Sequence, residues 1–180
     1  GLPFSDASFD LIFSNLMLQW CRPVDRYFSE IRRVLKPEGL LMLTSFGPDT
    51  LKELNQAWHR VDGSHRVHEF IDMHDLGDTL LQTGFAEPVM DMEMLTATYP
   101  DTTSLLRDIR GIGASFAATG RARGLMGKQS LRAFNHAYEQ FRGNDGRLPA
   151  TYEVIYGQAW APVLPPSMTP SDSIPIKPVS

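Results

Sequence analysis

The chain has 180 residues and a mass of 20.2 kDa, which suits one domain with a hydrophobic core and is too little for two ordinary domains. With 42% hydrophobic, 10% aromatic and 21% charged residues, its composition excludes a disordered or fibrous protein. The net charge of −4 argues against a protein that mainly binds nucleic acid, and no apolar run approaches the roughly 20 residues that cross a bilayer. Because the single cysteine, Cys21, cannot form an internal disulfide, we expect a cytoplasmic protein.

The first part of the chain predicts a strand, a helix and a second strand. Residues 9–13 are a short apolar run after a turn-rich segment, which is typical of a strand. From Pro23 to Leu35, apolar residues recur at helical spacing. Residues 40–44 are apolar without alternation, as in a strand buried on both faces. This order predicts a βαβ unit, and therefore a parallel sheet with helical cover.

The middle of the chain predicts two helices and a third strand. We expect helices at about residues 49–58 and 72–82, the second ending at Thr83–Gly84. Residues 86–99 are predicted to form a strand that leaves this helix. Thr102–Thr103 is the expected N-cap of the helix that follows.

The last part predicts another amphipathic helix, a final strand and a tail. The helix is marked by Leu131, Phe134, Tyr138 and Phe141. Residues 151–160 are rich in β-forming side chains and are the predicted last strand. Residues 162–180 contain six prolines in nineteen positions, so we expect a disordered tail there.

Glycines, histidines and the cysteine each invite a functional interpretation that their context disfavours. Gly111 and Gly113 follow a predicted helix and lack the third glycine of a nucleotide-binding loop, which favours a flexible or tightly packed connection. Four histidines lie close together in sequence, but their spacing is too loose for a zinc site, and we expect no metal. They are His59, His65, His68 and His74. Cys21 has no local signature of a nucleophile and is expected to be a half-buried thiol.

Charge is distributed unevenly along this acidic chain. The segment 104–132 contains six basic residues and one acidic residue, Asp108. The basic residues are Arg107, Arg110, Arg121, Arg123, Lys128 and Arg132. This bias suggests an acidic partner or substrate, although a solvated helix face explains it about as well. Arg107 and Arg110, three residues apart, can direct two guanidinium groups at one carboxylate.

The segment 14–20 directly follows the first predicted strand. In open α/β sheets, ligands bind outside the carboxyl ends of the strands, so contacts with a ligand are expected here. The alternative is the start of a helix that directs Leu16, Leu18 and Trp20 into the core.

Several motifs resemble a known family. Residues 2–10, Ser14-Asn15-Leu16, Gln19-Trp20 and residues 35–39 resemble the fourth and fifth strand regions of S-adenosylmethionine-dependent methyltransferases of the Rossmann-like class. Later segments resemble, more closely, the malonyl-acyl-carrier-protein O-methyltransferases of biotin synthesis. They are Gln19-Trp20-Cys21, Phe46-Gly47-Pro48-Asp49-Thr50-Leu51, Arg110-Gly111-Ile112-Gly113-Ala114 and Gly146-Arg147-Leu148-Pro149-Ala150-Thr151-Tyr152. The resemblance extends over about residues 2–162.

The resemblance implies an α/β fold that is only part of the Rossmann-like methyltransferase fold. It would hold strands four to seven, the last antiparallel and next to the fifth, with a helical insertion at about residues 101–142 between the last two strands. Residues 1–161 would be the C-terminal part of the domain. The chain also starts at Gly1 without an initiator methionine or a signal peptide, so we expect a piece of a longer protein.

The glycine-rich loop and the acidic residue that hold the cofactor in this fold would then lie before Gly1. We therefore expect little S-adenosyl-L-methionine binding by this chain alone. The exposed edge of the first strand is expected to cause self-association.

The resemblance also implies the roles of individual residues. Contacts with S-adenosyl-L-methionine would come from Ser14, Asn15, Leu16 and Trp20. Contacts with the substrate would come from Gln19, Arg107 and Arg110, and the basic segment 104–132 would receive an acidic acyl-carrier protein. The reaction implied is methyl transfer to the free carboxylate of a malonyl thioester. Because such a carboxylate is ionised at neutral pH, no residue is expected to act as acid or base.

Two alternatives stay open at the level of sequence. A mitochondrial complex I assembly factor that hydroxylates arginine is similar in the Asp-Thr-Leu, Asp-Leu-Gly and Pro-Ala-Thr-Tyr segments, and it shares the fold. A docking or assembly module without catalysis is the other alternative, because fold alone does not determine chemistry.

Overall fold

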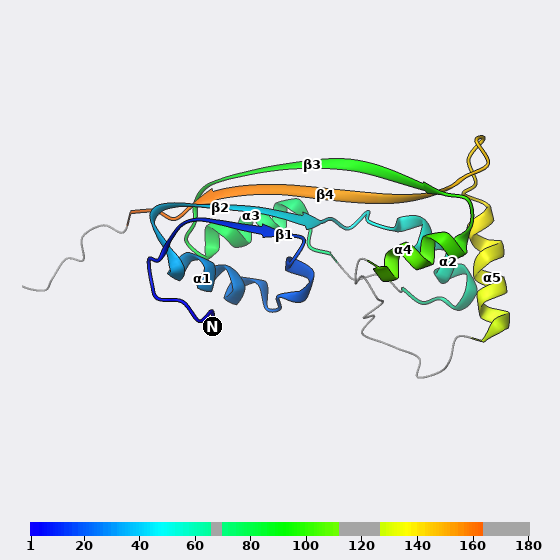
Figure 1. Cartoon of the computed structure of the whole chain (residues 1–180), viewed down its shortest axis with the longest axis horizontal. Coiled ribbons are helices and arrows are strands. Elements are labelled where there is room, and N and C mark those ends of the chain that lie inside the picture. The colour runs from blue at the N-terminus through cyan, green and yellow to red at the C-terminus, as the bar shows by residue number, and fades with distance from the viewer. Residues whose placement is uncertain (66–69, 112–126, 164–180) are drawn as a thin grey trace, which may run out of the picture.

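The computed structural model describes residues 1–65, 70–111 and 127–163, which form one mixed sheet with helices packed against it (Figure 1). The strands are β1 (Phe9–Asn15), β2 (Leu35–Phe46), β3 (Ala86–Tyr99) and β4 (Leu148–Trp160). The helices are α1 (Val24–Val34), α2 (Lys52–Asp62), α3 (Met73–Gln82), α4 (Thr102–Gly111) and α5 (Lys128–Glu139), with a short 3-10 turn, η1 (Leu18–Trp20). Within the described ranges, no helix combines the length and apolar character that a membrane span requires.

The sheet has the strand order β1-β2-β4-β3. β1 and β2 are parallel and are joined through η1 and α1, which confirms the predicted βαβ unit. β4, the last strand in sequence, lies between β2 and β3 and is antiparallel to both. Between β3 and β4, the described residues form the helices α4 and α5. This is the expected α/β arrangement of four strands, with an antiparallel last strand next to β2 and a helical insertion before it.

Local chemistry explains where the helices begin and end. Asp72 caps α3 by accepting a hydrogen bond from the backbone N–H of His74, and Gly84 follows the helix with a φ of 85°, which glycine adopts at little cost. The cap of α4 is Asp101, whose Oδ1 accepts from the N–H of Ser104 at 2.7 Å. Thr102 instead belongs to the helix and is buried, so the prediction that Thr102–Thr103 caps α4 is wrong.

The predicted helix at residues 49–58 is displaced along the chain, since α2 spans Lys52–Asp62. Leu51 has a left-handed backbone with a φ of 56°, and its N–H donates to the carbonyl of Thr151 in β4. The segment before Lys52 is therefore bound to the sheet and cannot continue the helix.

The buried side chains form two clusters, the first core and the second core, under the two ends of the sheet. The first joins α1 and α3 to β2 and β4 through Phe28, Leu41, Leu76 and Ile155. The second joins α2, α4 and α5 to β4, and in it the fully buried ring of Phe134 stacks on Trp58 at a centroid distance of 4.4 Å. Figure 1 shows α1 and α3 beneath one end of the sheet and α2, α4 and α5 grouped at the other.

One face of the sheet is uncovered in the described part of the chain. The register places Phe13 beside Met42 and Leu11 beside Leu40, and Leu40 beside Trp160 of β4. Side chains on this face are exposed, Leu11 by 53%, Phe13 by 60% and Met42 and Trp160 by 40% each. The prediction that residues 40–44 are buried on both faces is therefore wrong, because the described helices cover only the side of Leu41 and Leu43.

Some predicted features lie outside the described residues. They are most of the glycine-containing connection after Gly111, residues 112–126, together with His68 and residues 164–180 of the expected tail.

Candidate functional site

The carboxyl ends of β1 and β2 hold the loop that the sequence marked as a ligand site. Ser14 is buried, and its Oγ accepts a hydrogen bond from the hydroxyl of Tyr27 at 2.7 Å. Oδ1 of Asn15 accepts from Oγ1 of Thr44 at 2.6 Å, and the N–H of Leu16 donates to the carbonyl of Thr44 at 3.0 Å. The loop leaving β1 is therefore held against β2, with Asn15 exposed at the edge of the sheet.

The turn η1 separates buried from exposed side chains. Leu18 is buried in the first core, whereas Met17 and Trp20 are each 50% exposed. Oε1 of Gln19 is buried without a hydrogen-bond partner among the described residues. The helix-start alternative is therefore confirmed for Leu18 and is wrong for Trp20, which is half-exposed. We call residues 14–20 the rim.

Cys21 directly follows the rim and is half-buried, as predicted. Burial raises the pKa of its thiol above the ordinary value, so the thiol is protonated at neutral pH. A protonated thiol is a poor nucleophile, which agrees with the absence of a nucleophile signature in the sequence.

A cleft of about 620 Å³ is lined in part by residues that follow the rim closely in sequence. Its lining residues are Arg22, Pro23, Val24, Phe70 and Ile71. The ring of Phe70 packs edge-on against Phe46, the last residue of β2, at a centroid distance of 5.7 Å. The cleft therefore lies at the carboxyl end of β2, where ligands of α/β sheets bind.

An aromatic row continues from this cleft toward α4. Phe70 contacts Phe46, and Phe46 in turn lies 5.9 Å from the ring of Tyr152 in β4. The pKa of Tyr152 is raised by burial, then by a hydrogen bond with Tyr99 and by the charge of Asp108, so its hydroxyl stays neutral. These two neighbours place the hydroxyl near the start of the helical insertion. The aromatic row is thus half-buried surface between the two helical groups.

A buried carboxylate holds the loop that leaves β2. Oε2 of Glu153 accepts from the N–H of Asp49 at 2.8 Å. The backbone of Glu153 is also bound to this loop, because its N–H donates to Oγ1 of Thr50 and its carbonyl accepts from the N–H of Gly47. These bonds give the segment Phe46 to Leu51 a defined path beside the aromatic row.

The two arginines expected to bind substrate are in a different part of the fold from the rim. Arg107 and Arg110 are exposed on α4, whose buried face, with Leu105 and Ile109, belongs to the second core. Leu18 of the rim belongs to the first core. Tyr152 of the aromatic row is near enough to Asp108 in α4 for the charge of that carboxylate to raise the pKa of Tyr152.

The histidines are not arranged as a metal site in the part of the chain that the structure describes, where no group of three or more potential metal ligands occurs. The rings of His59 and His65 lie 5.2 Å apart, and His74 instead bonds to Asp72 at the start of α3.

Several residues near the rim carry no functional signal in the sequence. Tyr27 belongs to the amphipathic pattern of residues 23–35, and no motif includes Arg22 or Phe70. Their proximity to the rim depends on how α1 and the segment before α3 pack on the sheet, which no local pattern indicates. The motif Phe46–Leu51, by contrast, is part of the family resemblance, and it lies at the carboxyl end of β2.

A family model for a methyltransferase domain matches residues 1–43. The chain is 50% identical over 165 residues to a malonyl-[acyl-carrier protein] O-methyltransferase of Laribacter hongkongensis, covering 92% of this chain and 55% of the relative. It is 53% identical to the protein of the same name in Gallionella capsiferriformans, covering 90% and 56%. The chain therefore spans about half the length of the curated relatives it matches.

The fold has relatives among solved structures. A crystal structure of a protein from Bacillus halodurans, assigned as a methyltransferase, matches with a TM-score of 0.56 at 18% identity, over 91% of this chain and 68% of that one. At this identity the match concerns the fold alone, which is the mixed α/β fold of methyltransferases.

Proposed function

Because the chain is homologous over nine-tenths of its length to malonyl-[acyl-carrier protein] O-methyltransferases, we propose that it is part of an S-adenosylmethionine-dependent enzyme. That enzyme would methylate the free carboxylate of a malonyl thioester carried on acyl-carrier protein, in biotin synthesis. The identity of about 50% to these relatives carries the proposal. The position of the rim at the carboxyl end of the parallel strands supports it, and we assign the reaction to the cytoplasm.

The rim fits one side of the cofactor. Trp20 offers a half-exposed aromatic face of the kind on which a nucleobase stacks, and Asn15 offers an amide at the sheet edge. We assign Ser14, Asn15, Leu16 and Trp20 to the cofactor site. Within this group, Ser14 and Leu16 would shape the backbone of the loop that contacts the cofactor. Bound there, S-adenosyl-L-methionine would supply an electrophilic methyl group. Further contacts would come from residues outside this chain, as its half-length match to the relatives allows.

The substrate needs positioning more than it needs acid–base chemistry. Its carboxylate has an ordinary pKa of about 4 and is ionised at neutral pH, so the site has only to align it and exclude water. We assign this task to Gln19, Arg107 and Arg110, and we add Arg22, which lines the cleft beside the rim. The aromatic row provides apolar surface along the thioester between the rim and α4.

The uncovered sheet face bears on activity. An apolar face such as that of Leu11, Phe13 and Met42 is normally buried in a domain of this class. We propose that in the whole protein additional chain covers it and completes the cofactor site. We therefore expect residues 1–180 alone to be inactive and to associate with themselves through this face and the β1 edge.

Mass spectrometry tests the function. Malonyl-carrier protein is incubated with S-adenosyl-L-methionine and either a full-length protein containing this chain or the chain alone. A base-labile gain of one methyl group with the full-length protein only is expected. No gain with either would refute the proposal, and a gain of one oxygen on an arginine-containing substrate would identify the hydroxylase alternative instead.

A further inference from the structure

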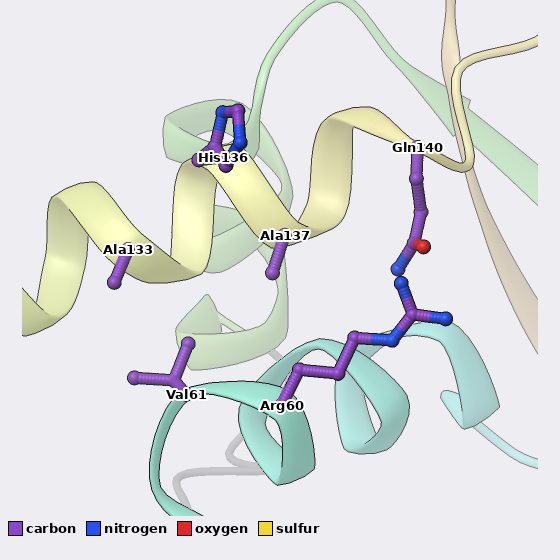
Figure 2. A pocket seen from close by; sticks show the side chains of 6 residues that line it. All are labelled: Arg60, Val61, Ala133, His136, Ala137 and Gln140. Atoms are coloured by element: carbon purple, nitrogen blue, oxygen red, sulfur yellow. The ribbon is translucent and has the colours of Figure 1, made fainter.

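A second cleft lies between α2 and α5, in the other helical group from the rim, and encloses about 460 Å³. Pockets of this size commonly hold small organic ligands. The residues that line it are Arg60, Val61, Ala133, His136, Ala137 and Gln140. Figure 2 shows the side chains of Arg60 and Gln140 pointing toward each other at one end, with Val61 and Ala133 away from them. The cleft therefore has a polar end and an apolar end.

The polar end presents hydrogen-bond donors that lack an acceptor. The guanidinium of Arg60 extends from α2, and Figure 2 shows the amide nitrogen of Gln140 turned toward it from α5. No ion pair among the described residues includes Arg60, and no carboxylate lies three or four positions from it along α2. Donors from two opposite walls can be joined by one acceptor group that a ligand supplies, and a carboxylate has two oxygens for this purpose.

The acidic residues near these helix ends are bonded elsewhere. Glu139 pairs with Arg142 at 2.6 Å, and Oδ1 of Asp62 accepts from the N–H of Ser64 at 3.0 Å. None of the six lining residues is acidic, so the polar end has the permanent positive charge of Arg60 and no negative charge of its own. One positive charge suits a carboxylate better than a phosphate monoester, which carries more than one negative charge near neutral pH.

The apolar end is small and preformed. Ala133 and Ala137 are one turn apart on α5, and Val61 faces them from α2 (Figure 2). The two helices are fixed against each other by the ring of Phe134, which stacks on Trp58 at a centroid distance of 4.4 Å. The small side chains leave room for a short alkyl chain, and a preformed surface loses little conformational entropy when a ligand binds.

We propose that this cleft binds a small aliphatic carboxylate, at a site separate from the rim. The carboxylate oxygens would accept hydrogen bonds from the guanidinium of Arg60 and the amide of Gln140. The alkyl chain would lie over Val61, Ala133 and Ala137. A neutral ligand of the same shape would leave the guanidinium without a charged partner, so the charge selects the ligand. The proposal does not depend on the proposed function, because the cleft shares no residue with the site assigned to it.

An NMR titration tests the proposal on a full-length protein that contains this chain, labelled at its alanine and valine methyl groups. Sodium hexanoate is the probe, and hexanamide is its neutral counterpart with the same chain. Hexanoate should shift the methyl signals of Val61, Ala133 and Ala137 to saturation, with a dissociation constant of about 1 mM, as the few atoms of this ligand allow. Hexanamide should bind at least about tenfold more weakly, because it brings no charge to Arg60.

Three variants locate the carboxylate. Arg60→Gln should weaken hexanoate binding about tenfold. Gln140→Glu should weaken it at least as much, because the new carboxylate would itself occupy the guanidinium of Arg60. Arg26→Gln is the matched control, since Arg26 is an exposed arginine on α1, and it should bind hexanoate like the wild type. All three positions are exposed, so circular dichroism should show the same fold in each variant.

Several results would overturn the proposal. Equal affinity for hexanoate and hexanamide would mean that the cleft binds by its apolar end alone. Wild-type affinity for hexanoate in Arg60→Gln would remove the guanidinium from the site, and saturable shifts confined to methyl groups outside the cleft would place the ligand elsewhere. Because the titration does not require methyl transfer, it decides this site even if the full-length protein methylates no substrate and the proposed function fails.

Discussion

The exposed edge of the sheet makes self-association of residues 1–180 the most direct consequence of the fold. Leu11 lies on β1, the edge strand, and is 53% exposed on the uncovered face. Full burial of a leucine side chain contributes about 2 kcal/mol, so covering the exposed half contributes about 1 kcal/mol per copy. In a symmetric pair that is about 2 kcal/mol, or roughly 30-fold in the dissociation constant. Leu11→Lys should weaken association by at least this factor, because the two new charges also repel.

Sedimentation equilibrium over a wide concentration range measures the effect. Leu81→Lys is the matched control, because Leu81 is 54% exposed but lies on the outer side of α3, away from the sheet edge. We expect the control to associate like the wild type. A monomeric wild type at high concentration would refute the reasoning, and so would an equal weakening by Leu81→Lys, since either result removes the edge and face of β1 from the interface.

Three further predictions concern stability. Glu53→Ala removes the acceptor of two hydrogen bonds from Thr151 and leaves a buried N–H unpaired, so the free energy of unfolding should fall by about 2–3 kcal/mol in urea titrations, whereas exposed Glu87→Ala should change it little. Phe134→Ala removes a fully buried ring that stacks on Trp58 and should cost about 3–5 kcal/mol, with altered tryptophan fluorescence; a loss below 1 kcal/mol would mean that the second core is not packed in this way. The hydrogen bond from the N–H of Ser104 lowers the pKa of Asp101 in the folded state, so its contribution is present above the unfolded pKa near 4 and disappears as pH falls through the lower folded value. Asp101→Ala should therefore reduce the urea midpoint at pH 7 and have little effect near pH 2, and an equal effect at both pH values would contradict the capping role.

Local patterns predicted the elements well where the signal is contained in a few neighbouring residues. The strand predicted at residues 86–99 matches β3. The signals at the two ends of α3 were also local, with Asp72 at its start and Gly84 after its end. Errors arose where distant contacts decide. The segment 49–51 has a helical pattern, but the N–H groups of Asp49 and Leu51 donate to Glu153 and Thr151 of β4, about a hundred residues later.

The candidate site shows the same difference between features set by local sequence and features set by distant contacts. The position of the rim was predictable, because a loop that follows a parallel strand lies at the carboxyl edge of any α/β sheet. The burial of residues 40–44 was not predictable, because an apolar strand has the same sequence pattern whether one or both of its faces are covered. In the structure, Met42 is exposed. Likewise, the basic segment 104–132 was visible in the sequence, but its described part is divided between two helices, with Arg107 and Arg110 on α4 and Lys128 and Arg132 on α5.

The loop after β2 provides a test of tertiary control over local structure. A Cβ atom at Gly47 would collide with Cδ of Glu153 and lie 2.6 Å from both of its carboxylate oxygens, which is far inside contact distance. The backbone of Glu153 cannot retreat, because it is bound to Gly47 and Thr50. In Gly47→Ala the carboxylate must therefore leave the N–H of Asp49, and overpacking of this kind costs about 1–3 kcal/mol.

A double-mutant cycle separates this steric cost from any effect of alanine on the loop itself. In the Glu153→Ala background no carboxylate remains to collide, so Gly47→Ala should cost close to nothing there, and the two substitutions should be strongly non-additive. Urea titrations of the four proteins give the coupling free energy. If Gly47→Ala costs the same in both backgrounds, the glycine is required by the backbone of the loop and not by Glu153. In that case the path of the segment Phe46 to Leu51 would be set locally, and the buried carboxylate would not be what positions it beside the aromatic row.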